Sequence, residues 1–264
     1  MAMPFFAPGT DPGPDFVALL RRAATPLPSE LRGLDPTQVG HGTTCVAIRY
    51  ADGVVMAGDR RATAGNWISN RRIEKVFPAD RFSGVAIAGA AGPAIEMVRL
   101  FQLQLEHYEK VEGTVLSLEG KANQLSQMIR GNLAAAMQGM AVVPIFAGYD
   151  LNRGSGRLFQ YDITGGRYEE ADHTSTGSGQ MHASTVVKLG WKPEMGREET
   201  IDLVLRALWE AADEDSATGG PDMIRGIYPI VATITEAGFE QVDESELVDR
   251  FRALIERLEG GEGS

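Results

Sequence analysis

Cysteine is nearly absent from this sequence of 264 residues, in which Cys45 is the single example. One cysteine rules out an intrachain disulfide and excludes metal sites built from several thiolates. The four histidines also lack metal-ligand spacing; they are His41, His107, His173 and His182. We therefore expect no metal ion and no other cofactor, and a cytoplasmic location is the simpler interpretation.

Long apolar runs and an excess of positive charge are missing too. The longest apolar stretches, such as 85–91, fall far short of the roughly 20 residues needed to cross a bilayer, and nothing near the N-terminus resembles a signal peptide. The 25 Lys and Arg residues are outnumbered by 36 Asp and Glu, for a net charge of -11. Phosphate backbones bind clustered basic side chains, and no such cluster is visible, so we expect neither nucleic acid nor a membrane as a partner.

Several common catalytic motifs do not occur. The sequence contains no H-E-x-x-H, no C-x-x-C, no G-x-S-x-G and no G-x-x-x-x-G-K-[ST]. Their absence argues against zinc peptidases, dithiol redox proteins, hydrolases with a nucleophile elbow and P-loop nucleotidases.

The first 42 residues differ in composition from the rest. They hold seven of the chain's 13 prolines and show no sustained periodicity beyond a possible short helix at 15–22. Such a segment is a poor core-former and is either a disordered tail or a propeptide. Residues 43–264 are long enough for one catalytic domain with a helical C-terminal tail.

Regular structure is predicted from Thr43 onward. Asp52-Gly53 is a turn signal between two strand-like runs, and apolar residues at helical spacing mark the helices. In chain order we expect strands at 43–50, 54–59, 73–77 and 82–88, helices at 93–111 and 118–140, strands at 142–149, 156–162 and 168–171, helices at 180–189 and 197–214, a strand at 227–235 and a helix at 244–258. This order predicts an α+β fold, a four-layer αββα sandwich in which each of two antiparallel sheets is shielded by its own helix pair.

Thr43 is the candidate nucleophile, within His41-Gly42-Thr43-Thr44-Cys45. A threonine hydroxyl needs a base beside it, and cleavage after Gly42 would supply the threonine's own amine. In an antiparallel hairpin the start of the first strand lies beside the end of the second, which places Thr43 near Asp59. Lys75 can reach the same end of the sheet. It shares a strand face with apolar Ile73 and Phe77 and therefore needs an anion, for which Asp59 is the natural partner.

Two of these features have ordinary alternatives. Asp59 and Lys75 are equally explained by a half-buried structural ion pair, although their convergence on Thr43 favours a function. Gly89 leaves a strand just before the predicted helix at Pro93, so its N–H can approach a ligand and form an oxyanion hole, or it simply makes a tight turn.

Together these residues resemble the proteasome β-type subunits, members of the N-terminal nucleophile hydrolases. The resemblance covers 43–235 and rests on Gly42-Thr43-Thr44, Gly58-Asp59-Arg60-Arg61-Ala62-Thr63, Lys75, Gly89, Gly177-Ser178-Gly179 and Asp215-Ser216-Ala217-Thr218-Gly219-Gly220. The stretches 105–110, 130–139 and 216–226 resemble the actinobacterial branch in particular. The family fold is the αββα sandwich that the element order predicts.

The resemblance implies roles for the site residues. Thr43 Oγ would attack the scissile carbonyl while its freed amine takes the proton, and Lys75, held by Asp59, would stabilise the incipient alkoxide. The Gly89 N–H would hold the oxyanion. Ser178 and Asp215 match positions that orient the amine and its water, and Thr218 stands where the family more often has serine.

A peptide substrate and a self-cleavage site are implied as well. The backbones of Thr63, Gly89 and Ala91 would pair with an extended substrate strand. The pocket for the residue before the cut would be lined by Ala62, Ile73, Phe77, Ile87 and Ala91. All five are apolar, so we expect cleavage after hydrophobic residues. Thr43 would also cut the Gly42–Thr43 bond autocatalytically, so the chain with residues 1–42 attached would be a zymogen.

The implied assembly is four stacked seven-membered rings, α7β7β7α7, with active sites facing a closed chamber. The partners would be proteasome α-type subunits, other β subunits and an ATPase regulatory ring. Unfolded proteins, tagged by a small protein modifier, would be degraded there to short peptides.

Three other interpretations remain open. Cys45 could be the nucleophile, although it lies within a predicted strand with no histidine nearby in sequence. The chain could belong to the simpler bacterial threonine proteases of two six-membered rings, whose chains are shorter and lack a long leader. It could also be a catalytically silent ring subunit.

Overall fold

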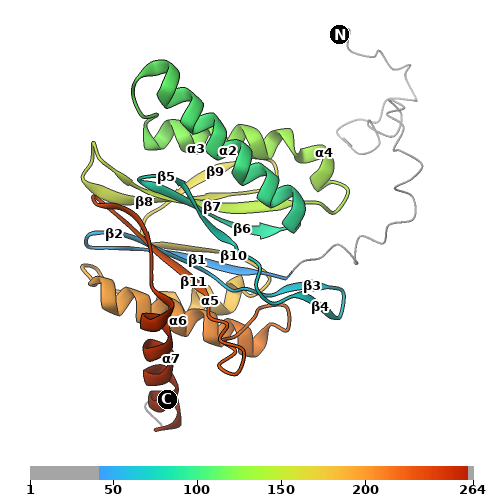
Figure 1. Ribbon diagram of the computed structural model, residues 1–264, viewed down its shortest axis with the longest axis vertical. Coiled ribbons are helices and arrows are strands. Elements are labelled where there is room, and N and C mark those ends of the chain that lie inside the picture. Colours follow the sequence, from blue (N-terminus) through green and yellow to red (C-terminus); the bar gives the residue numbers. More distant parts are fainter. Residues whose placement is uncertain (1–41, 261–264) are drawn as a thin grey trace, which may run out of the picture. The chain divides into compact units, whose positions relative to one another are not determined.

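Two five-stranded antiparallel sheets stack face to face, and helices cover the outer face of each in the computed structural model, which describes residues 42–260 (Figure 1). The first sheet has the order β10-β1-β2-β11-β12, formed by β1 (Thr44–Tyr50), β2 (Gly53–Gly58), β10 (His173–Gly177), β11 (Ile230–Thr235) and β12 (Gly238–Gln241). The second has the order β5-β6-β7-β8-β9, formed by β5 (Val76–Asp80), β6 (Ser83–Gly89), β7 (Val142–Asp150), β8 (Ser155–Tyr161) and β9 (Arg167–Glu170). A small separate hairpin pairs β3 (Ala62–Ala64) with β4 (Trp67–Asn70).

Three apolar clusters fill the spaces between the layers. The helices are α2 (Ala91–Glu112), α3 (Leu118–Gly131), α4 (Leu133–Ala136), α5 (Gln180–Gly190), α6 (Arg197–Glu214) and α7 (Glu244–Glu259). One cluster lies between the sheets, a second packs the first sheet against α5, α6 and α7, and a third packs the second sheet against α2 and α3. The αββα sandwich expected from the element order is therefore confirmed.

The first hairpin shows how local sequence sets the central strands. β1 pairs with β2 through a short turn at Ala51 and Asp52, with Tyr50 opposite Gly53. Gly53 is needed sterically, because a Cβ there would lie 2.1 Å from the carbonyl oxygen of Ile234 on the neighbouring strand β11. β1 is thereby fixed between β2 and β10, with its first residue at the sheet end where the candidate site lies.

The strand predicted at 73–77 is displaced. β5 begins only at Val76 and continues through Pro78 to Asp80, three residues beyond the predicted end at residue 77. Proline is tolerated there because β5 is the edge strand of its sheet and need not donate at every position. Lys75 consequently precedes the strand instead of sharing a strand face with Ile73 and Phe77.

Other differences concern short elements. Six strands, not four, precede the first long helix, because the hairpin β3–β4 was not predicted. Strands β10 and β12 were also missed: β10 buries Thr174, Ser175 and Thr176 instead of apolar side chains, and β12 has only four residues. The helix expected at 118–140 stops at Gly131, where Asn132 caps it and bonds to the Met140 carbonyl.

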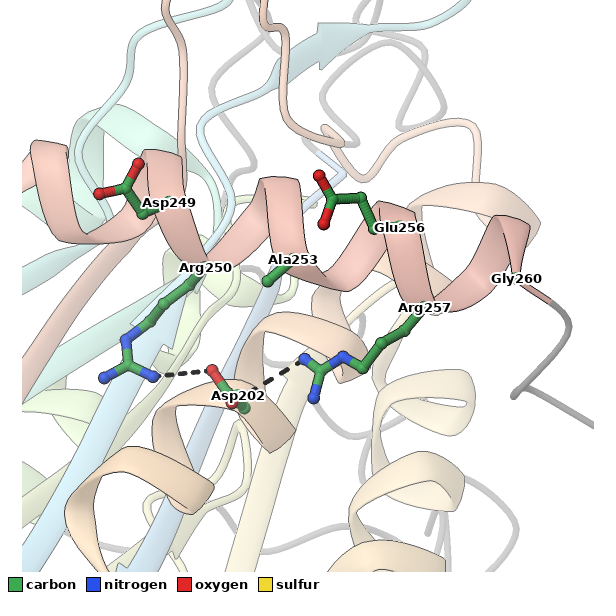
Figure 2. A pocket seen from close by; sticks show the side chains of 7 residues that line it. All are labelled: Asp202, Asp249, Arg250, Ala253, Glu256, Arg257 and Gly260. Atoms are coloured by element: carbon green, nitrogen blue, oxygen red, sulfur yellow. Dashed lines mark hydrogen bonds and ion pairs between the residues drawn. The ribbon is translucent and has the colours of Figure 1, made fainter.

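The C-terminal helix α7 is attached to α6 by both apolar and charged contacts. Leu247, Phe251 and Leu254 are buried in the cluster beneath it. Beside them Arg250, 15% exposed, pairs with Asp202 of α6 at 2.8 Å (Figure 2). Arg257 reaches the same carboxylate at 3.8 Å, so this surface hollow between the two helices is bridged by mutually neutralising charges.

The short helix expected at 15–22 and most of the leader lie outside the described residues. Between residues 42 and 260 no helix combines the length and apolar character of a membrane span.

Candidate active site

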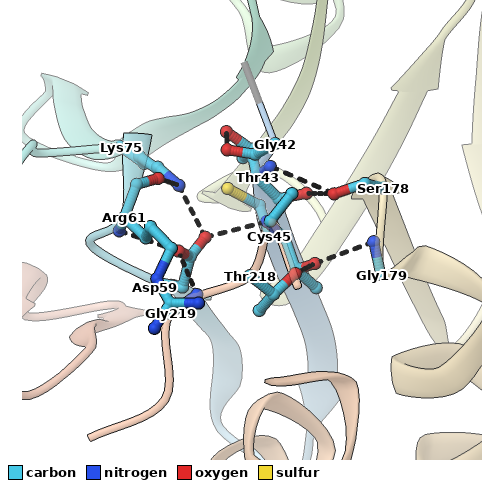
Figure 3. A network of polar contacts seen from close by, with 12 residues as sticks. Gly42, Thr43, Cys45, Asp59, Arg61, Lys75, Ser178, Gly179, Thr218 and Gly219 are labelled. Carbon is cyan, nitrogen blue, oxygen red and sulfur yellow. Dashed lines mark hydrogen bonds and ion pairs between the residues drawn. The ribbon is translucent and has the colours of Figure 1, made fainter. Parts of the chain in front are cut away.

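Thr43 lies immediately before β1, at the end of the sheet where β2 and β10 flank that strand (Figure 3). Its carbonyl accepts the Ser178 N–H at 2.8 Å, which anchors it to the segment after β10. The residue is 4% exposed. Lys75 and Asp59 lie on one side of Thr43 and Ser178 on the other.

Asp59 is a buried anion surrounded by donors. Its Oδ1 accepts Lys75 Nζ at 2.6 Å and the Thr44 N–H at 2.8 Å. Its Oδ2 accepts the N–H groups of Arg61 and Gly219, each at 2.8 Å. Four donors from four separate segments therefore fix a carboxylate that is fully shielded from solvent.

Lys75 is the cation that Asp59 holds. It is 3% exposed, and its ammonium also donates to the Arg61 carbonyl at 2.6 Å. Two of its three donors are thus engaged. The expected pairing of Asp59 with Lys75 is present, at the end of the sheet where Thr43 lies.

Ser178, Asp215 and Thr218 form a second polar group on the other side. Ser178 Oγ accepts the Thr43 N–H at 3.3 Å and donates to Asp215 Oδ2 at 2.5 Å. Thr218 Oγ1 donates to the same oxygen at 2.6 Å. Burial acts to raise the pKa of Asp215, but the hydroxyl bonds from Ser178 and Thr218 outweigh it and leave that pKa below its ordinary value.

Thr44 belongs to this group although the sequence analysis gave it no role. Its fully buried hydroxyl accepts the Gly179 N–H at 3.0 Å and shares a 2.5 Å hydrogen bond with Thr218 Oγ1. Because side chains alternate along a strand, the sequence indicates only that Thr44 lies on the face opposite to Thr43. It does not indicate which loops the Thr44 hydroxyl contacts.

The Gly42–Thr43 peptide is itself held in place. Thr43 Oγ1 donates to the Gly42 carbonyl at 2.8 Å, and the Gly42 N–H donates to Thr63 Oγ1 at 3.1 Å. A Cβ on residue 42 would lie 1.8 Å from the Cβ of Ala217, so only glycine fits. The hydroxyl of Thr43 is therefore within hydrogen-bonding distance of the carbonyl that precedes it.

Gly89 ends β6, and its φ of +107° is a conformation that favours glycine. A Cβ there would lie 2.1 Å from the Ala141 carbonyl. The Ile87 carbonyl contacts Cys45 Sγ at 3.5 Å, so this end of β6 lies across from the start of β1. No hydrogen bond joins Gly89 to Thr43 within residues 42–260, so the oxyanion role stays a prediction.

The residues expected to line the substrate pocket come from several elements around Lys75. Ile87 donates its N–H to the Lys75 carbonyl at 2.8 Å, and Ile73 donates to the Arg60 carbonyl at 3.2 Å. Phe77 and Ile87 belong to the cluster packed against α2 and α3. The other two are Ala62 on β3 and Ala91 at the start of α2. Thr63, whose backbone was expected to pair with a substrate strand, also lies on β3.

Cys45 is not suited to be a nucleophile. It is fully buried, and burial raises the pKa of its thiol to about 12, with Lys75 opposing that shift and Asp59 adding to it. The reactive form of cysteine is the thiolate, which is scarce at neutral pH with such a pKa. No cluster of metal-binding side chains was found in the part of the chain that the structure describes.

Comparison with known proteins shows the family to which this chain belongs. Residues 39–225 match the family model described as proteasome subunit. Over 248 residues the chain is 60% identical to a protein named proteasome subunit beta from Acidimicrobium ferrooxidans, covering 94% of this chain and 91% of the relative. It is 52% identical over 257 residues to a protein of the same name from Streptomyces griseus, covering 96% and 90% respectively. The chain therefore belongs to the proteasome subunit family.

Proposed function

We propose that this chain is a threonine-type endopeptidase subunit of a bacterial proteasome core particle, with Thr43 as its nucleophile. The observation that carries the proposal is the buried Lys75–Asp59 pair at 2.6 Å, located at the sheet end where Thr43 precedes β1. A buried ion pair is costly to maintain. The Lys75 cation would stabilise the alkoxide that forms on Thr43, and this catalytic role would explain why the buried pair is kept.

Each step of peptide hydrolysis has a candidate group. The freed amine of Thr43 takes the hydroxyl proton, directly or through a water that Ser178 and Asp215 orient, and Thr43 Oγ1 attacks the scissile carbonyl. The protonated amine of Thr43 then gives this proton to the leaving nitrogen as the C–N bond breaks, and a water hydrolyses the ester that remains on Thr43. Lys75 stabilises the developing alkoxide. The Gly89 N–H stabilises the oxyanion, an interaction worth about 3 to 4 kcal/mol when such donors are well placed.

Residues 1–42 act as an autocatalytically removed propeptide, and residues 43–264 form the mature catalytic chain. While Thr43 is in a peptide bond its nitrogen donates to Ser178 and cannot serve as a base. The 2.8 Å contact of Thr43 Oγ1 with the Gly42 carbonyl supports attack of that hydroxyl on its own preceding peptide.

Intact-mass spectrometry of wild type and Thr43→Ala tests nucleophile and propeptide together. We expect a wild-type species that begins at Thr43, and an uncleaved precursor without peptidase activity for the variant. Thr44→Ser, which keeps a hydroxyl at the neighbouring position, is the matched control and should be processed. Normal processing of Thr43→Ala would refute the assignment.

The assembly is proposed from the family. Proteasome subunits assemble with other proteasome subunits, and we expect α-type partners in an α7β7β7α7 particle in the cytoplasm. An ATPase ring would control access to this particle, and its substrates would be unfolded proteins that carry a small protein modifier. Sedimentation of the chain mixed with its α partner should give a four-ring particle. A stable two-ring, six-membered particle would favour the simpler bacterial threonine proteases.

Cleavage after hydrophobic residues follows from the apolar side chains of Ala62, Ile73, Phe77, Ile87 and Ala91. Fluorogenic peptides with Tyr, Arg or Glu before the cut should be ranked with Tyr first, and a dominant Glu preference would contradict this. An epoxyketone or β-lactone inhibitor should leave an adduct on Thr43, whereas a silent ring subunit would gain none.

A further inference from the structure

A small cavity lies next to the segments that hold Asp59, because Arg61 and Gly219, which donate to that carboxylate, are among its lining residues. Its volume is about 40 Å³, and it is lined by Arg60, Arg61, Arg71, Gly219, Gly220, Asp222, Ile227, Tyr228 and Pro229. One water needs roughly 10 to 15 Å³ of such volume, so this cavity has room for a small ion and not for an organic ligand of ordinary size.

Three arginines, Arg60, Arg61 and Arg71, line this cavity in a chain whose net charge is -11. Arg60 donates to the Arg72 carbonyl and Arg61 to the Ser216 carbonyl, each at 2.9 Å. Within residues 42–260 neither of them, nor Arg71, forms an ion pair with a carboxylate. No basic cluster was expected from the sequence. The three arginines come together because the loop after β2 meets the loop after β4.

One donor in this cluster has no acceptor. The Nε of Arg60 is buried and makes no hydrogen bond to any residue that the structure describes. A buried donor without a partner is costly, about 1 to 3 kcal/mol, and such groups are rare in native proteins. An acceptor that enters the cavity from solution would satisfy it.

The single carboxylate of the lining does not fill this role. Asp222 Oδ2 accepts from Arg225 Nη1 at 2.6 Å, and Oδ1 accepts the Arg225 N–H at 2.9 Å. Asp222 is therefore neutralised by a residue outside the cavity lining. The excess positive charge of the cavity remains.

We propose that this cavity, lined by Arg60, Arg61 and Arg71, binds a small inorganic oxyanion of the phosphate or sulfate class. The planar guanidinium fork matches the spacing of two oxygens on such an ion, which a monatomic anion does not offer. The ion would bridge the Arg60–Arg61 turn, the loop at Arg71 and the segment at Gly219–Gly220. Two of these segments donate the Arg61 and Gly219 amides to Asp59 at 2.8 Å, so the bound ion would stabilise the segments that hold this carboxylate.

Titration calorimetry of the full chain with inorganic phosphate tests this proposal, independently of any peptidase activity. We expect saturable binding, weakened at least ten-fold by Arg60→Gln and by Arg71→Gln. Arg71 is exposed and makes no ion pair in the described part of the chain, so its substitution is the variant that tests binding if Arg60→Gln fails to fold. Arg252→Gln, an exposed arginine on α7, is the control and should bind phosphate as the wild type does.

A thermal melt supplies the second measurement. Phosphate or sulfate should raise the melting temperature of the wild type more than chloride does at equal ionic strength, and Arg71→Gln should lose that difference. The proposal is overturned by unsaturable binding, by equal effects of chloride and phosphate, or by unchanged phosphate affinity in Arg71→Gln.

Discussion

At the residue scale, the hydroxyl of Thr218 connects two groups of the site. It donates to Asp215 Oδ2 at 2.6 Å and lies 2.5 Å from the hydroxyl of Thr44, which in turn accepts the Gly179 N–H. This chain of hydroxyls positions the carboxylate that holds Ser178 beside the nitrogen of Thr43. Thr218 and Thr44 are thus positioning residues for the proposed reaction.

Thr218→Val should lower kcat about ten-fold or more, because it removes a hydrogen bond to a charged carboxylate, worth about 1.5 to 3 kcal/mol. Thr218→Ser keeps the hydroxyl and should retain most of the activity. The pH dependence of the two variants distinguishes a positioning role from a packing role. Without the Thr218 hydrogen bond, the pKa of Asp215 rises toward its ordinary value. As the solution is acidified, Thr218→Val should therefore lose activity at a higher pH than the wild type or Thr218→Ser. Equal kinetics of the Val and Ser variants would contradict a role for the hydroxyl.

Cys45 should be unreactive in the folded protein. Its thiol is fully buried and has a pKa of about 12, so the thiolate that attacks alkylating reagents is rare near pH 8. We expect no carboxamidomethyl adduct after treatment with iodoacetamide at that pH, and complete modification after unfolding in guanidinium chloride. Rapid alkylation of the native chain, with loss of peptidase activity, would reopen the possibility of a cysteine nucleophile.

Prediction from the sequence was uneven among the residues of the site. The position of Asp59 near Thr43 was predicted from the hairpin, which brings the end of β2 beside the start of β1, and the pairing of Asp59 with Lys75 was also predicted. The reason given for Lys75 was wrong, since it precedes β5 and is desolvated by the meeting of loops. Gly219 and Thr44 could not be assigned, because their contacts depend on segments more than 100 positions apart in the chain.

At the scale of elements, a buried ion pair joins α3 to the edge strand β5. Lys121, 3% exposed, pairs with Asp80, whose other oxygen accepts the Phe82 N–H at 3.0 Å and the Ser83 hydroxyl at 2.6 Å. The pair fixes the first turns of α3 against the strand that follows Lys75.

Lys121→Met should reduce the free energy of unfolding by about 3 kcal/mol, because it leaves the Asp80 carboxylate partly buried without a cation. Chemical denaturation measures this, and the double variant Lys121→Met with Asp80→Asn should recover part of the loss. Lys110→Met removes a fully exposed pair with Glu106 on α2 and is the control, with no measurable change expected. Equal stability of Lys121→Met and the wild type would show that the pair contributes nothing.

The long helices were predicted well and the short strands poorly, for a physical reason. α6 spans Arg197–Glu214 as expected because a full apolar face recurs at helical spacing along it. β10 buries Thr174, Ser175 and Thr176, so its sequence shows no apolar alternation. Two of these hydroxyls have acceptors, since Ser175 donates to the Gln180 carbonyl and Thr176 to the Val143 carbonyl. β3 and β4 depend on pairing with each other and not on a buried face.

At the scale of the whole molecule, the two sheets bring together the groups of the site, and in the proposed function removal of residues 1–42 would start its chemistry. Lys75 comes from the loop before β5, Thr43 from the start of β1 and Asp215 from the end of α6. These three residues already have this arrangement while Thr43 is still bonded to Gly42. The proposed removal of residues 1–42 would therefore change only the nitrogen of Thr43, from an amide to a free amine. Activation would then require no rearrangement of the fold.

A chain that begins at Thr43, released from a cleavable tag, should therefore be active without any self-processing step. Its kcat/KM for a peptide should rise with pH through the pKa of the new α-amine, which for an ordinary α-amine is about 8, because only the neutral amine accepts the hydroxyl proton. The same chain with its N-terminal amine acetylated is the matched control, and it should be folded and inactive. An active acetylated chain, or a pH profile without that rising limb, would show that the base is a different group.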